Sequence, residues 1–173
     1  MEAKMFKVGD LVLYGTTGVC RVSEIKEKDL TGKGKTQLYY HLAPLYQTCV
    51  ISAPVNSDKI FIRPIISREE AERLIDHMSS ISSDHYPTGA ARELTEQYEA
   101  AINTHDCIIW ASLLHSIYTK KEKLTIQKKK FSSLDERYMR KTEDLLFGEL
   151  AAAMGMDRKA VASVISKRIS EAM

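Results

Sequence analysis

The hydrophobic period of the chain changes after Pro64, and this change is the feature that most constrains the fold. Before Pro64, apolar and polar residues alternate in short runs that are separated by Gly- and Pro-containing turns, which is typical of β-strands. After Pro64, apolar residues recur every three or four positions, which is typical of amphipathic helices. The sequence therefore predicts two domains: a β domain over residues 1–65 and a helical domain over residues 66–173.

Five short strands are expected in the β domain, over residues 8–14, 19–26, 37–45, 48–53 and 59–63. Tight turns join them, and such a pattern predicts a small antiparallel barrel of the SH3 or Tudor type. A small open barrel has edge strands, which can accept a strand from a partner. Residues 48–53 are a candidate edge because the run is short, apolar and ended by Pro54. An ordinary interior strand explains the same run at least equally well.

The helical domain is predicted to be a compact bundle of about five helices. Helix starts are indicated by two capping boxes, one from Ser67 to Glu70 and one from Ser133 to Glu136, and by Asp106. Gly155 is expected to end the fourth helix, at about residue 154. Residues expected to face inward include Leu74, Leu94, Tyr98, Ile109, Leu113, Leu114, Ile117, Leu146, Val161, Val164 and Ile165.

Sequence motifs for catalysis or for cofactor binding are not found. The cysteines Cys20, Cys49 and Cys107 are odd in number and widely spaced, which favours buried free thiols in a reducing compartment. The histidines are scattered, and paired carboxylates such as Glu69 and Glu70 lie in first helical turns, where they favour the helix dipole. We expect no metal, no cofactor and no enzymatic activity. We also expect a cytoplasmic protein, because no leader or long apolar run is present.

Charge is segregated along the chain. Residues 67–118 carry 3 Lys/Arg against 9 Asp/Glu, whereas residues 119–173 carry 13 against 8. Six lysines fall within 11 residues near the start of the basic segment: Lys120, Lys121, Lys123, Lys128, Lys129 and Lys130. Such a cluster can bind the phosphates of duplex DNA without reading its sequence. A solvated loop between helices is about equally consistent with the cluster alone.

A resemblance to a known family rests on the segment FKVGDLVLYGTTGVCRVSEI and on YYHLAPL followed by a strand that ends at Pro54. Both resemble the RNA-polymerase-interacting domain that CarD/CdnL-like bacterial transcription regulators share with the transcription-repair coupling factor. Two later segments, HDCIIWASLLHSIYTKKEKL and SSLDERYMRKTEDLLFGELAAAMGM, are similar to the helical domain of these regulators. The resemblance covers about residues 5–170, and its spacing is similar to the Firmicutes-type branch.

The resemblance implies a non-catalytic transcription regulator. Its N-terminal domain would bind the RNA polymerase β subunit by extending the sheet, and its helical domain would contact promoter DNA at the upstream edge of the bubble. An aromatic wedge would then modulate open-complex stability. The implied protein is bacterial and reaches the nucleoid through RNA polymerase, without strong sequence specificity for DNA.

The family's functional positions map onto this sequence residue by residue. Polymerase binding is implied for a basic side chain and a strand: Lys28, Cys49, Val50, Ile51, Ser52 and Ala53. Ser52 stands where many members carry an arginine. DNA binding is implied for Tyr86, which replaces the usual tryptophan wedge because Trp110 lies mid-helix, and for Arg92, Lys120, Lys121, Lys123 and Lys128.

Two points stay open from the sequence. The acidic segment 67–118 also suits an adaptor whose helical domain binds protein instead of DNA. An exposed strand edge allows either a monomer or a strand-swapped dimer.

Overall fold

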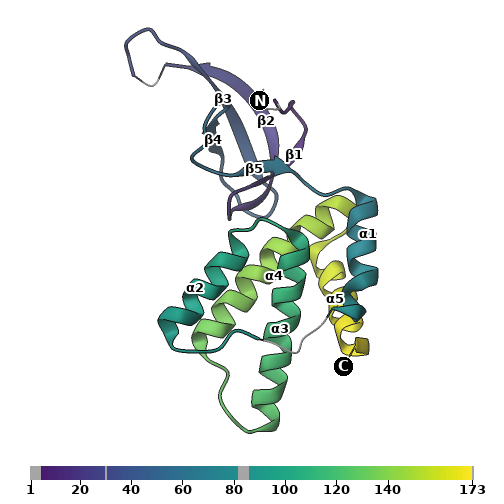
Figure 1. Cartoon of the computed structure of the whole chain (residues 1–173). Helices are drawn as coiled ribbons and strands as arrows, with labels where there is room; N and C mark the ends of the chain where they lie inside the picture. The colour runs from purple at the N-terminus through teal and green to yellow at the C-terminus, as the bar shows by residue number, and fades with distance from the viewer. Residues whose placement is uncertain (1–4, 30, 82–85, 173) are drawn as a thin grey trace. The chain divides into compact units, whose positions relative to one another are not determined.

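The computed structural model describes residues 5–29, 31–81 and 86–172. The chain divides into two compact units, Met1–Ile65 and Ile66–Met173 (Figure 1). The first unit contains the strands and the second contains the helices, which confirms the predicted β + α fold.

The N-terminal unit is a five-stranded antiparallel sheet. Its strands are β1 (Leu11–Tyr14), β2 (Gly18–Lys28), β3 (Gln37–Pro44), β4 (Ile51–Pro54) and β5 (Ile62–Pro64), in the spatial order β4-β3-β2-β1-β5. The long β2–β3 hairpin extends beyond the other strands (Figure 1). Among the described residues no ladder joins β4 to β5, so both are edge strands.

The β2 strand departs from the strict alternation that the sequence suggests. A bulge shifts its register between Val22, which pairs with Leu42, and Glu24, which pairs with His41. Before the bulge Cys20 and Val22 face the core, and after it Ile25 packs there in place of Glu24. The extra residue therefore keeps a carboxylate out of the apolar interior.

The start of β4 corrects the predicted strand, which was expected to begin at Thr48. The observed strand begins at Ile51, because continuing the register would pair Cys49 with Pro44. Pro44 has no N–H to donate to such a pair. Residues 45–50 form a turn instead, and this turn leaves Cys49 exposed, contrary to the prediction that all three cysteines are buried.

The helical unit is built around α4. Its elements are α1 (Arg68–His77), a short 3₁₀ helix η1 (Met78–Ser80), α2 (Ala91–Ile102), α3 (Cys107–Ile126), α4 (Ser133–Met154) and α5 (Arg158–Ala172). Helix α4 packs against each of the other four α-helices. The core includes Tyr98, Trp110, Leu114, Leu146, Leu150 and Ile165, all fully buried.

Most helix ends agree with the predicted caps. Ser67 and Glu70 form the expected capping box, and the Asp106 side chain caps α3. Gly155 ends α4 with a left-handed φ of 62°. The cap of α4 was wrong by one position: Ser132, not Ser133, accepts the backbone N–H of Asp135. Two adjacent serines offer the same hydroxyl, so the local sequence cannot separate them.

Two residues predicted to face inward are exposed. The inward stripe at the start of α3 consists of Cys107, Trp110 and Ala111, and Ile109 lies outside it. In α5, Val161 and Ile165 face the core at a spacing of four, which leaves Val164 at the edge of the buried face.

Candidate polymerase and nucleic-acid interfaces

The outer edge of β4 carries backbone groups directed away from the sheet. Hydrogen-bonded and non-hydrogen-bonded pairs alternate along an antiparallel ladder. The Val55 N–H donates to the Leu38 carbonyl at 3.0 Å, and this bond shows which residue pairs of the β3–β4 ladder are the hydrogen-bonded ones. Ile51 and Ala53 therefore turn their N–H and C=O groups toward β3. Ser52 turns both groups to the open side.

Side chains around this edge separate into an inner and an outer set. Ala53 is buried and Ile51 packs against the same core, so both are fixed by the sheet. Ser52 lies on the outer side, where the Lys28 Nζ donates to its hydroxyl at 3.0 Å. Val50, just before β4, is 66% exposed. The structure thus brings together two residues that the sequence predicted separately, Lys28 on β2 and Ser52 on β4.

On the helical unit, aromatic rings lie beside lysines at the C-terminal end of α3. The Lys123 Nζ is 5.3 Å from the ring centroid of Tyr86, which is half-buried, and the Lys121 Nζ is 5.5 Å from that of Phe131. These distances are within the range of cation–π contacts. Phe131 was not predicted as a site residue, since its only sequence signal is its place after the lysine run.

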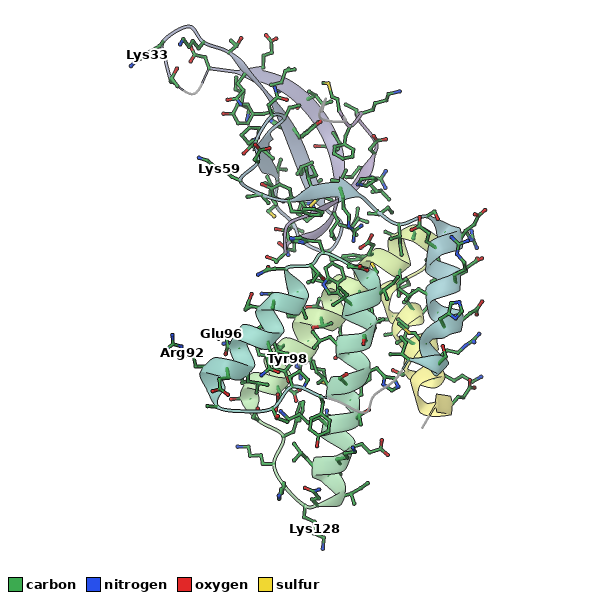
Figure 2. The ribbon with its side chains drawn as sticks, viewed as in Figure 1. Lys33, Lys59, Arg92, Glu96, Tyr98 and Lys128 are labelled. Carbon is green, nitrogen blue, oxygen red and sulfur yellow. The ribbon has the colours of Figure 1, made fainter. Side chains whose placement is uncertain are left out.

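Lys128 follows α3 in a left-handed conformation, with a φ of 57°. Its N–H donates to the Thr125 carbonyl, and the Lys129 N–H donates to the Leu124 carbonyl. These two bonds form a Schellman motif, in which glycine is the usual residue at the left-handed position. The motif directs Lys128 away from the helix, as Figure 2 shows.

Two of the predicted DNA-binding cations are paired with carboxylates. Arg92 is exposed, with its Nε 3.5 Å from Glu96 one turn along α2 (Figure 2). Lys120 is largely buried, and its Nζ lies 3.0 Å from Asp135. The exposed lysines Lys121, Lys123 and Lys128 therefore carry the accessible positive charge among the predicted residues.

Residues 6–66 match the family model of the CarD-like/TRCF RID domain. The N-terminal unit is a CarD-like RNA-polymerase-interacting domain. The match spans the whole described sheet, including β4 and the edge formed by Ser52. The match supports a transcription-related protein that interacts with RNA polymerase. The β4 edge of this RNA-polymerase-interacting domain (RID domain) is therefore the candidate docking surface.

Outside the RID domain, sequence reasoning missed two buried carboxylates. Glu149 is fully buried in α4, where it accepts the Ile66 N–H at 2.9 Å and the Cys107 thiol at 3.1 Å. Asp135 is also buried and binds Tyr98 and Lys120. A charged residue inside the apolar run around Glu149 was the signal that could have revealed the first.

Metal ligation and membrane crossing find no candidate among the described residues. No group of three or more His, Cys, Asp and Glu side chains is placed to hold a metal ion there. Within the same residues, no helix combines the length and apolar character needed to cross a membrane. Burial raises the pKa of the Cys20 thiol to about 11, so this cysteine stays protonated at neutral pH and is a poor nucleophile.

Proposed function

We propose that the chain is a non-catalytic transcription regulator that docks on the β subunit of RNA polymerase through the outer edge of β4. Its helical unit would contact promoter DNA at the upstream edge of the bubble and modulate open-complex stability. The observation that carries the proposal is the outer edge of β4, with which no other described strand pairs and which lies within a domain matched to a polymerase-interacting family.

The docking half of the proposal uses backbone chemistry. A partner strand laid along β4 would exchange hydrogen bonds with the N–H and C=O of Ser52, as in other cases of strand addition. The Lys28 ammonium, held beside this edge by the Ser52 hydroxyl, would meet an acidic or carbonyl group of the partner. Exposed Val50 would add apolar contact at the end of the new ladder.

The DNA half uses Tyr86 and the exposed lysines of α3. Inserting a ring between base steps costs a few kcal/mol of lost stacking per step. This cost is smallest where the duplex is already opening, so a tyrosine wedge favours a melting junction over intact duplex. Lys121, Lys123 and Lys128 would hold the flanking phosphates, which makes the contact independent of sequence and sensitive to salt.

Paired variants at Ser52 test the docking half. Ser52→Pro removes the outward N–H but no ladder bond to β3, because that N–H points away from the sheet. Ser52→Ala removes only the hydroxyl. In a pull-down of the β subunit by the full chain, Ser52→Pro should lose at least about fivefold in affinity, because the partner carbonyl left without its donor costs about 1–3 kcal/mol. Ser52→Ala should stay within about threefold.

Equal binding by wild type and a folded Ser52→Pro variant would refute docking through this edge. Circular dichroism of both variants establishes that the sheet is intact. If Ser52→Ala loses as much affinity as Ser52→Pro, the side chain carries the contact instead of the backbone.

Tyr86→Ala tests the DNA half separately. It should leave the pull-down unchanged, because Tyr86 lies outside the RID domain, and it should shorten the lifetime of promoter open complexes. Tyr86→Phe is the matched control, since it keeps the ring and should retain most of the lifetime. An unchanged lifetime in Tyr86→Ala would exclude this residue as the wedge.

A second candidate function is an adaptor whose helical unit binds protein. The acidic balance of residues 67–118 favours it, as do the carboxylate partners of Arg92 and Lys120. DNA affinity of the full chain discriminates the two candidates. For a DNA-binding surface, the logarithm of the binding constant should fall with the logarithm of salt concentration at a slope of about −0.9 per phosphate contacted. An adaptor should show no DNA affinity at physiological salt.

A further inference from the structure

We infer that Lys120 is a positioning residue that clamps the segment carrying Tyr86, and that it does not contact DNA phosphates. The inference rests on the proposed role of Tyr86. The Lys120 Nζ donates to the carbonyl of Pro87, the residue after Tyr86, at 3.1 Å, and to Asp135 Oδ1 at 3.0 Å. Its side chain is only 12% exposed, so its ammonium faces the protein interior.

The segment needs such a clamp because the following helix has no cap of its own. Ala90 is the N-cap of α2, and no side chain of the described residues accepts a hydrogen bond at this cap. Gly89 precedes it with a φ of 123°, a conformation that side chains rarely adopt. Local sequence therefore leaves the entry to α2 loosely specified, and contacts from elsewhere must fix it.

Two further contacts hold the same segment. The Gln97 Nε2 donates to the Thr88 carbonyl at 3.0 Å, reaching back from the second turn of α2. Lys123, three residues after Lys120 on α3, places its ammonium over the Tyr86 ring. Side chains three apart lie on one helix face. One face of α3 thus holds both the backbone after Tyr86 and its ring.

The charge of Lys120 is used within the protein. Asp135 is 3% exposed, and both of its carboxylate oxygens accept hydrogen bonds. Oδ1 accepts from the Lys120 ammonium and from the Tyr98 hydroxyl, the latter at 2.5 Å. Oδ2 accepts from the Ser132 hydroxyl at 2.8 Å. Moving Lys120 to a phosphate would leave this buried carboxylate without its counter-charge, which is strongly unfavourable. The ion pair therefore locates the Tyr86 segment against α3 and α4.

The experiment measures backbone order by ¹⁵N relaxation in the full chain. In wild type, order parameters at Tyr86, Thr88 and Gly89 should be near the rigid value of about 0.85. In Lys120→Met they should fall below about 0.6, as the Pro87 carbonyl is released. Lys121→Met is the matched control, because it removes a neighbouring charge from the same helix and should leave these values unchanged.

Gln97→Ala is the second variant, because Gln97 is exposed and its truncation does not threaten the fold. It should lower the order parameter of Thr88 without unpairing Asp135. Fluorescence of the single tryptophan, Trp110, establishes whether Lys120→Met is folded. If that variant is unfolded, the double variant Lys120→Met/Asp135→Asn takes its place, because it leaves no unpaired buried charge. Unchanged order at Tyr86, Thr88 and Gly89 in the folded Lys120 variant would overturn the clamp.

Open-complex assays separate failure of the clamp from failure of the proposed function. Lys120→Met should shorten the open-complex lifetime without changing how steeply the logarithm of that lifetime depends on the logarithm of salt concentration. Loss of a phosphate contact would instead lower this slope by about 0.9. A slope change of that size in Lys120→Met would overturn the inference. If Tyr86→Ala has no effect on the open-complex lifetime but Lys120→Met still disorders the segment, the role of Lys120 is supported and the proposed role of Tyr86 as a wedge is refuted.

Discussion

Replacing His115 by leucine should stabilise the helical unit. His115 lies in the middle of α3, is 2% exposed, and neither ring nitrogen has a hydrogen-bond partner among the described residues. A buried polar group left unsatisfied costs about 1–3 kcal/mol. Leucine has a similar size, removes both nitrogens and has a higher helix propensity than histidine. We therefore expect His115→Leu to raise the free energy of unfolding by about 1–3 kcal/mol at pH 7.5.

The stability advantage of His115→Leu over wild type should increase as the pH falls. Burial lowers the pKa of His115 below its ordinary 6.5, so the unfolded chain binds this proton more tightly than the folded chain. The wild type therefore keeps its full stability with respect to His115 above pH 6.5, and it loses stability through this residue as the pH falls toward the folded-state pKa. Across that window the variant should gain up to about 1.4 kcal/mol per pH unit relative to wild type.

Trp110 makes the measurement specific to the helical unit. It is the only tryptophan in the chain and is fully buried in α3. Urea titrations followed by its fluorescence, at pH 7.5 and at pH 5.5, give the free energy of unfolding by linear extrapolation. The variant-minus-wild-type difference cancels other titrating groups, including Glu143, whose pKa is raised by burial and which acts in the opposite direction.

His77→Leu is the control, because His77 is exposed at the end of α1 and should change the free energy by no more than about 0.5 kcal/mol. The reasoning would be refuted if His115→Leu destabilised the unit at pH 7.5. It would also be refuted if variant and wild type lost stability equally between pH 7.5 and 5.5, since the imidazole would then not be the titrating group.

Three further variants test the helix ends and the buried glutamate. Lys128→Gly should stabilise the helical unit by about 1 kcal/mol, because it relieves a left-handed lysine, and should lower the salt slope of DNA binding by about 0.9. Gly155→Ala, at the matching position after α4, should cost about 1 kcal/mol of strain alone, since an added Cβ meets no atom within 4 Å. Glu149→Leu should cost about 1 kcal/mol, because it removes the acceptor of the partly buried Ile66 N–H. The same tryptophan reporter measures all three, and shifts of the opposite sign would contradict the assignments.

The elements of the fold were predictable because their signals are local. The change of period after Pro64, the box from Ser67 to Glu70 and the cap at Asp106 all act within one or two turns of chain. Details that depend on a partner strand were not predictable. The bulge after Val22 depends on which side chains of β2 pack in the core. The late start of β4 depends on Pro44 of the neighbouring strand β3.

The candidate site was less predictable than the fold, because its charges find partners far along the chain. The lysine run gave Lys120 and Lys121 the same expected role, yet Lys120 pairs with Asp135, 15 residues away. Successive helical residues are separated by about 100°, so a run of like residues is always divided among faces. Only tertiary packing decides which of them turns inward.

The two halves of the proposed complex differ in how strongly they constrain sequence. Docking by a strand edge uses an N–H, which every residue except proline carries, and a C=O, which every residue carries. The side chain at Ser52 can therefore change without loss of the ladder. Selectivity for one partner must then come from the few side chains beside the edge, chiefly Lys28 and exposed Val50. Lys28→Glu should accordingly reduce capture of the β subunit more than Ser52→Ala does, because a reversed charge repels an acidic partner whereas a lost hydroxyl removes one exposed hydrogen bond. Equal effects would place selectivity elsewhere on the sheet.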